Sequence, residues 1–147
     1  EADRIIIGAI QKAHRQILVQ AFSFTHRKIA QALISARRRG VDVQLIADRE
    51  QTEKISGDHI ANMAAAGVQV LLDGEHNAAH NKVMIIDRGF SDAALITGSM
   101  NFTYAAQYRN AENLLVFRGN PALTDAYLSN WKRHREHAEP YLPQPQK

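Results

Sequence analysis

Residues 17–47, which read ILVQAFSF-THRKIAQALISARRRG-VDVQLIA, decide the predicted fold. Residues 17–24 and 41–47 are short apolar runs rich in Ile, Leu, Val and Phe, which is typical of buried strands. Between them, apolar side chains recur at helical spacing from Thr25, which can cap a helix, to Arg39, after which a glycine ends it. This strand–helix–strand order indicates a partly parallel sheet.

The same alternation continues on both sides of this stretch. A first helix is predicted at about 5–14, with Asp3 as its cap, although the run Ile5-Ile6-Ile7 is also compatible with a strand. Residues 138–147 are predicted to be an irregular tail. The remaining elements are predicted as helices at 57–66 and 121–137 and as strands at 68–72, 82–87, 93–97 and 112–117. We therefore predict one α/β domain over residues 1–147, a mixed, partly parallel β-sheet with helices on both faces.

Composition agrees with one globular domain and excludes several classes of protein. The chain has 147 residues, of which 45% are hydrophobic and 22% charged, so it can form a single core. It has no cysteine, which excludes disulfides, a thiolate zinc site and a cysteine nucleophile. No apolar run approaches the roughly 20 residues that a membrane-spanning helix needs. The formal net charge of +3 permits a phosphate-bearing partner.

Polar side chains suited to phosphate chemistry gather around two neighbouring predicted strands. His80 and Lys82 stand two apart at the start of one strand, so their side chains share a face. Ser99 and Asn101 follow the next strand in a loop that begins with Gly98, where hydroxyl, amide and backbone N–H groups can approach an anion. Lysine and asparagine can stabilise phosphate oxygens, and histidine can attack phosphorus or transfer a proton near neutral pH. These residues predict a phosphate site.

The pattern His80-x-Lys82-x4-Asp87 followed by Gly98-Ser99-x-Asn101 resembles the HKD motif of the phospholipase D superfamily. The surrounding sequence is similar to the small, single-motif bacterial endonucleases of that superfamily over nearly the whole chain. The resemblance implies a phospholipase D-like fold. It also implies that His80 is the nucleophile that forms a phosphohistidine, that Lys82 and Asn101 bind the phosphate together with His80, and that Ser99 orients the site. No metal and no other cofactor is implied.

Two further acidic residues have roles that the resemblance suggests. Glu112 occupies the place of a carboxylate that pairs with the second nitrogen of the catalytic imidazole, although Arg109 is an alternative partner for it. Asp87 is expected to be structural. The segment from Asp87 to Gly98 is longer than in the family, and we expect a larger hairpin loop around 88–92 to absorb the extra residues without moving the site.

The motif occurs once, which has a consequence for assembly. In-line displacement by a histidine needs a second group to protonate the leaving oxygen, and single-motif members of the family take it from a second chain. We therefore predict a two-fold symmetric homodimer with a composite active site in which His80 of each subunit faces the other.

The function predicted is that of a metal-independent phosphodiesterase, namely a nonspecific endonuclease for single- and double-stranded DNA, with RNA left open. One alternative is a phospholipid phosphodiesterase of the phospholipase D or cardiolipin hydrolase type. Another is a nucleic-acid-binding module with an inactive site. Export to the periplasm or outside the cell is predicted, with the cytoplasm left open.

Other polar residues have simpler interpretations. The run Arg37-Arg38-Arg39 fits a solvated helix end that complements the helix dipole, although it can also contact DNA phosphates. His134 and His137 lie on the last predicted helix beside Trp131 and are interpreted as partly exposed packing.

Overall fold

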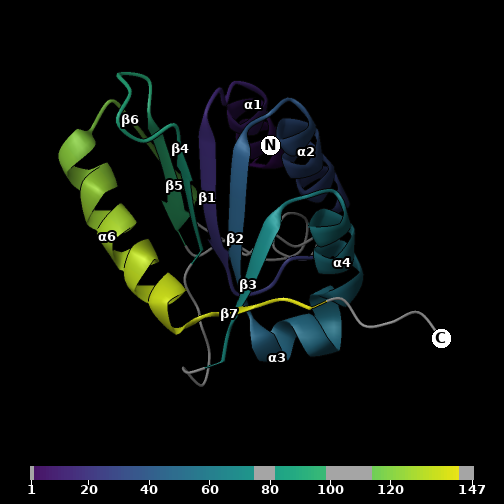
Figure 1. The fold of residues 1–147 in the computed structure, drawn as a ribbon. Helices are drawn as coiled ribbons and strands as arrows, with labels where there is room; N and C mark the ends of the chain where they lie inside the picture. Colours follow the sequence, from purple (N-terminus) through teal and green to yellow (C-terminus); the bar gives the residue numbers. More distant parts are fainter. Residues whose placement is uncertain (1, 75–81, 99–113, 143–147) are drawn as a thin grey trace.

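The computed structural model describes residues 2–74, 82–98 and 114–142. Within these residues the strands form one seven-stranded sheet in the order β6-β5-β4-β1-β2-β3-β7 (Figure 1). The strands are β1 (Gln16–Ala21), β2 (Asp42–Asp48), β3 (Gln69–Asp73), β4 (Val83–Ile86), β5 (Ala94–Gly98), β6 (Leu114–Arg118) and β7 (Glu139–Pro140). Strands β1, β2 and β3 are parallel, whereas β4, β5, β6 and β7 pair antiparallel with their neighbours. The sheet is therefore mixed and partly parallel, as predicted.

Helices cover both faces of this sheet. Figure 1 shows α6 alone on one face, with α1, α2 and α4 on the other. The helices are α1 (Ala2–Gln11), α2 (Arg27–Arg38), α3 (Arg49–Gln51), α4 (Gly57–Ala65) and α6 (Pro121–His137), together with a π-helical turn, η1 (Thr52–Ser56). This arrangement confirms the predicted α/β fold.

Two hydrophobic cores follow from the two layers. Along β1, Ile17 and Val19 face the core formed with α1, α2 and α4, whereas Leu18 faces the core that contains Trp131 of α6. Successive side chains of a strand point to opposite faces, so one buried strand supplies both cores. The Trp131 ring N–H also donates a hydrogen bond to the carbonyl of Val19 at 3.0 Å, which anchors α6 to the centre of the sheet.

Helices α2 and α4, which connect the parallel strands, end in the same way, and this explains where β2 and β3 begin. Gly40 and Gly67 have φ values of 96° and 97°, a left-handed conformation that favours glycine. The N–H of Val41 donates to the carbonyl of Ala36, and the N–H of Gly40 donates to that of Arg37. This Schellman arrangement satisfies the last carbonyls of α2 and directs the chain into the sheet.

Several predicted boundaries were wrong. The cap of α2 is His26 rather than Thr25, because the Nδ1 atom of His26 accepts a hydrogen bond from the Ile29 N–H. Asp3 lies inside the first turn of α1 rather than before it. Strand β1 ends at Ala21, three residues before the predicted end, because the chain there turns toward α2 and places Phe24 in the core below that helix.

Regular structure also occurs in two segments that the sequence did not assign to a helix or a strand. Residues 49–56 form α3 and η1 between β2 and α4. In the predicted tail, Glu139 and Pro140 pair with Leu72 and Leu71 of β3, and the N–H of Tyr141 donates to the carbonyl of Val70 at 2.9 Å. The first part of the tail is therefore a short edge strand.

Candidate active site

Lys82 lies at the end of the sheet where four strand termini meet. It immediately precedes β4, whose first residue, Val83, pairs with Gln20 of β1 and with Thr97 of β5. Gly98, the last residue of β5, pairs with Leu114, the first residue of β6. The start of β4, the ends of β1 and β5 and the start of β6 therefore lie together. We call this the Lys82 end of the sheet.

The Lys82 side chain is half-buried and lies against an aromatic ring. Its Nζ atom is 5.6 Å from the centroid of the Phe22 ring, close enough for a cation–π interaction. Its backbone carbonyl accepts a hydrogen bond from the Thr97 hydroxyl at 3.2 Å. Contacts to the chain on both sides thus hold the position of a cation at this end of the sheet.

The other predicted catalytic residues, His80, Ser99, Asn101 and Glu112, lie outside the described residues. Their neighbours in the sequence are described. His80 is two positions before Lys82, Ser99 follows Gly98, and Glu112 is two positions before Leu114. The three chain segments that carry the motif therefore join the sheet at the Lys82 end.

Asp87, at the other end of β4, holds the turn between α1 and β1. It is buried, and its carboxylate accepts backbone N–H hydrogen bonds from His14, Arg15 and Gln16 at 2.8, 2.7 and 3.0 Å. Its φ of 52° is in the left-handed region, which aspartate tolerates better than most residues. All three contacts are to main-chain donors of the scaffold, so Asp87 fixes the fold and is remote from Lys82.

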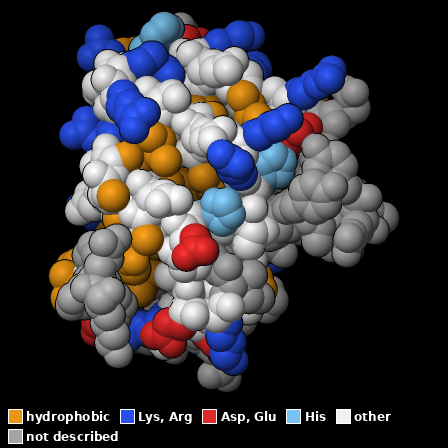
Figure 2. Space-filling model, turned by 90° about the vertical axis from the view of Figure 1, so that its right-hand side faces the viewer, with side chains coloured by type: hydrophobic (Ala, Val, Ile, Leu, Met, Phe, Trp, Pro, Cys, Tyr) orange, Lys and Arg blue, Asp and Glu red, His pale blue; other side chains and the backbone are white. Residues whose placement is uncertain are grey.

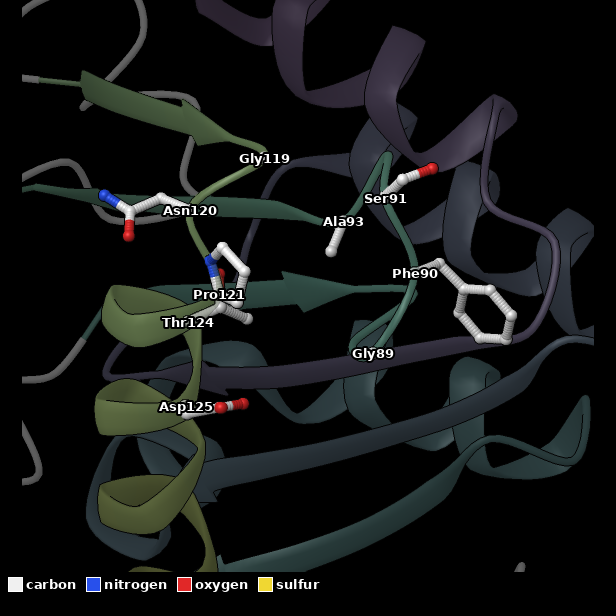
Figure 3. Close-up of a pocket in the computed structure, with 9 residues that line it drawn as sticks. All are labelled: Gly89, Phe90, Ser91, Ala93, Gly119, Asn120, Pro121, Thr124 and Asp125. Atoms are coloured by element: carbon white, nitrogen blue, oxygen red, sulfur yellow. The ribbon is translucent and has the colours of Figure 1, made fainter.

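The long connection between β4 and β5 also lies at this far end. Residues 87–93 join Ile86 to Ala94, which are paired across the antiparallel hairpin. Its extra residues therefore extend away from Lys82, as expected from the sequence. The loop lines a pocket of about 380 Å³ with the start of α6 (Figure 3). The pocket contains none of the predicted catalytic residues.

A histidine–carboxylate contact that sequence reasoning missed joins α6 to the sheet. His134 is partly exposed, as expected, and its Nδ1 atom is 3.2 Å from Oδ2 of Asp73, which is fully buried at the end of β3. Because β3 is parallel to β1, Asp73 lies at the same end of the sheet as Lys82. No sequence signal links the two residues, since they are 61 positions apart and meet only when α6 packs on the sheet.

A second histidine, His26, follows β1 and is buried. His26 Nε2 is 3.8 Å from Oδ2 of Asp3, and the His26 side chain is buried. Burial lowers the pKa of His26 below its ordinary value, while the carboxylate of Asp3 opposes that shift. The neutral imidazole that results can accept the Ile29 N–H and cap α2.

Among residues 2–74, 82–98 and 114–142, no three histidine, aspartate or glutamate side chains are grouped to hold a metal ion. In the same part of the chain, none of the helices combines the length and the apolar character needed to cross a bilayer.

Comparison with known proteins identifies relatives across this fold. Residues 6–135 match the family described as cardiolipin synthase, PLD-like domain. Phospholipase D of Rickettsia conorii is 40% identical over 129 residues, which are 87% of this chain and 61% of the relative. Mitochondrial cardiolipin hydrolase of Xenopus tropicalis is 29% identical over 129 residues, 88% of this chain and 59% of the relative. The chain thus spans about three fifths of the length of these curated relatives.

Among solved structures, the chain is similar to the crystal structure of Nuc, a phospholipase D family member from Salmonella typhimurium. The TM-score is 0.90 at 31% sequence identity, and the match covers 97% of this chain and 92% of that one.

Proposed function

Because this chain belongs to the phospholipase D superfamily, as a PLD-like domain, we propose that it is a metal-independent phosphodiesterase and a nonspecific endonuclease for DNA. The observation that carries the proposal is the meeting of strand termini at the Lys82 end. There the segments bearing His80-x-Lys82, Gly98-Ser99-x-Asn101 and Glu112 join the sheet beside one another. Likeness to Nuc over almost the full length of both chains supports the endonuclease.

The proposed reaction has two displacements at phosphorus. Nε2 of His80 attacks, an N–P bond forms, and the bond from phosphorus to the leaving sugar oxygen breaks as that oxygen takes a proton from an acid on the opposite side. Water then attacks the phosphohistidine, the N–P bond breaks, and the same partner removes the proton of the water. Lys82 and Asn101 stabilise the charge on the phosphate oxygens, Ser99 orients the site, and Glu112 holds the imidazole by its other nitrogen.

The acid partner is proposed to be His80 of a second subunit, because the sequence contains the motif once. A homodimer with one composite site at its two-fold axis would provide both histidines. Light scattering of the purified protein should give twice the chain mass of 16.5 kDa. A monomer that cleaves DNA would contradict the composite site.

The deciding experiment is plasmid digestion in excess EDTA, with the His80→Ala variant as the control. We expect the wild-type protein to convert supercoiled plasmid and the variant to be inactive. Protection of the plasmid by EDTA would overturn the metal-independent mechanism. Tight binding of DNA by the wild-type protein without cleavage would support an inactive binding module instead.

A second candidate function has support from the relatives, since proteins named phospholipase D and mitochondrial cardiolipin hydrolase match most of the chain. The same phosphohistidine chemistry would then act on a phospholipid headgroup. Assays with phosphatidylcholine and cardiolipin beside DNA distinguish the two. Hydrolysis of either lipid at a kcat/KM above that for DNA would replace the endonuclease by a phospholipase.

A further inference from the structure

A groove of about 520 Å³ runs between α2 and α4 on the outer face of the molecule. Figure 2 shows this side, where Lys and Arg side chains gather over the upper part with hydrophobic side chains between them. The groove is lined by residues of both helices and the turn after α4: Arg27, Ala30, Gln31, Ile34, Arg38, His59, Asn62, Ala65 and Ala66. None of these lining residues is acidic, and α2 contains no Asp or Glu at all.

The two arginines of the groove have no polar partner among the residues that the structure describes. Arg27 and Arg38 are exposed, and no described residue forms a hydrogen bond or ion pair with either guanidinium group. The neighbours of Arg38 differ from it. Arg37 donates to the Gly67 carbonyl at 3.0 Å, and Arg39 donates to the carbonyl of Ile10 at 3.1 Å. The triple-arginine run therefore divides into two structural residues and one that is available to a ligand.

The spacing of the groove arginines fits a polymer better than a single ion. Arg27 and Arg38 are eleven residues apart, so they share one face of α2 and are separated by about 16 Å along the helix axis. A separation of about 16 Å corresponds to roughly five nucleotides of one strand of stacked DNA. Gln31 and Asn62 can donate further hydrogen bonds between the two cations, and Ile34 provides an apolar floor.

One end of the groove is close in sequence to the strand termini where the motif joins the sheet. Arg27 begins α2 only a few residues after β1, and β1 ends beside the start of β4. Arg38 lies at the opposite end of α2. Resting on the endonuclease function proposed above, we propose that the α2–α4 groove binds the phosphodiester backbone of a nucleic acid outside the cleavage site, through Arg27 and Arg38.

The groove is suited to nucleic acid rather than to a membrane surface. Among the described residues the exposed large hydrophobic side chains are Ile5, Phe90, Leu115 and Leu142, and none lines the groove. It therefore offers no apolar anchor for a bilayer. None of its lining residues is Phe, Tyr or Trp, so base stacking should contribute little and the binding should depend little on base sequence.

The test compares two double variants of the full chain that remove the same charge. Arg27→Gln with Arg38→Gln changes the groove, whereas Arg88→Gln with Arg118→Gln removes two exposed arginines at the far end of the sheet. Each pair is introduced into the His80→Ala protein, and the affinity for a labelled 20-base-pair duplex is measured by fluorescence anisotropy at several salt concentrations. Each pair is also introduced into the active protein, whose hydrolysis of bis(p-nitrophenyl) phosphate and of plasmid is measured.

We expect the groove pair to weaken duplex binding by about eightfold per arginine at about 0.1 M salt and to lower the salt slope by about two. The single Arg38→Gln variant should lower the slope by about one. The control pair should change binding much less. Hydrolysis of the small diester should be unchanged in every variant, because that substrate is too short to reach the groove.

If the groove pair and the control pair have equal affinities and salt slopes, the proposed role of the groove is overturned, while the proposed endonuclease function still stands. Hydrolysis of the small diester with no binding or cleavage of DNA would overturn the proposed function and, with it, the groove. A last outcome concerns sedimentation with cardiolipin–phosphatidylcholine vesicles. If only the groove double variant fails to sediment with them, and its duplex binding is unchanged, the groove binds a membrane and the nucleic-acid proposal is overturned.

Discussion

The two ends of strand β4 carry two residues of one sequence motif and use them in different ways. Lys82 lies before the strand, half-buried against Phe22 among the termini of β1, β5 and β6. Asp87 lies after it, about 16 Å away along an extended chain, and accepts three backbone hydrogen bonds. The spacing between Lys82 and Asp87 is therefore the length of one strand, which separates the proposed catalytic end of the sheet from the end that Asp87 anchors.

The largest effect is expected when the Lys82 cation is removed. Lys82→Ala should lower kcat for DNA cleavage by about 10²–10³-fold, because a positioned charge on the phosphate oxygens is lost in the transition state. The melting temperature should stay close to that of the wild type. Lys132→Ala, at an exposed lysine on α6, is the matched control and should retain full activity. Steady-state kinetics on plasmid and thermal unfolding provide the two measurements.

Asp87→Asn should have the opposite effect, with a loss of stability and little change in kcat. An amide can accept with only one of its two terminal atoms, and it loses the charge that strengthens the three hydrogen bonds, so we expect a loss of about 2–4 kcal/mol in the free energy of unfolding. Denaturant titration measures this loss, and Asp92→Asn in the same loop, an exposed carboxylate, should leave stability unchanged. Wild-type stability combined with a large loss of kcat would show that Asp87 takes part in the chemistry.

A smaller effect is expected when the aromatic ring beside Lys82 is changed. Phe22→Leu removes the ring face beside the Lys82 ammonium, and we expect kcat to fall roughly fivefold, since a cation–π contact contributes about 1 kcal/mol. Phe22 acts through Lys82 as a positioning residue, so the loss should be in kcat rather than KM. Phe22→Trp should restore most of the activity. A Leu variant with wild-type kcat would show that the ring does not position the ammonium.

The smallest effect concerns His26 and the pH dependence of stability. Because burial lowers its pKa in the folded protein, the unfolded chain takes up the proton first as the pH falls through the ordinary value of 6.5. The free energy of unfolding should therefore decrease from pH 7.5 to pH 5. In His26→Asn, which keeps a capping side chain, this decrease should be smaller, whereas His14→Asn at an exposed histidine should behave as the wild type. Melting temperatures across this range give the comparison, and identical slopes for all three proteins would exclude the burial effect.

The topology could be predicted because burial leaves a direct trace in the sequence. Apolar runs such as VDVQLIA at 41–47 are long enough for a strand, and α2 has one apolar face, so their order indicates a layered sheet. Boundaries set by tertiary contacts could not be predicted. His26 caps α2 where Thr25 has the better intrinsic preference, and Glu139–Pro140 form a strand because β3 presents a free edge to them.

For the candidate site, features set by short spacings in the sequence could be predicted, whereas contacts between residues far apart in the sequence could not. The two-residue interval between His80 and Lys82 and the loop at Gly98 are visible as short patterns, and their segments join the sheet at one end. The His134–Asp73 pair and the division of the triple-arginine run are not visible in this way. Each depends on which surface a helix turns toward its neighbour, and that is decided only when the layers assemble.

The contacts of Asp87 also constrain the order in which the protein can be built. The amides of residues 14–16 leave the ribosome more than seventy positions before the carboxylate that binds them. Until β4 is synthesised, the start of β1 lacks both that carboxylate and its antiparallel neighbour. In a nascent chain that ends before Asp87, the segment around residues 14–16 should therefore stay unfolded, and such a chain should depend on chaperones. The native state should form only after the β4–β5 hairpin has emerged from the ribosome.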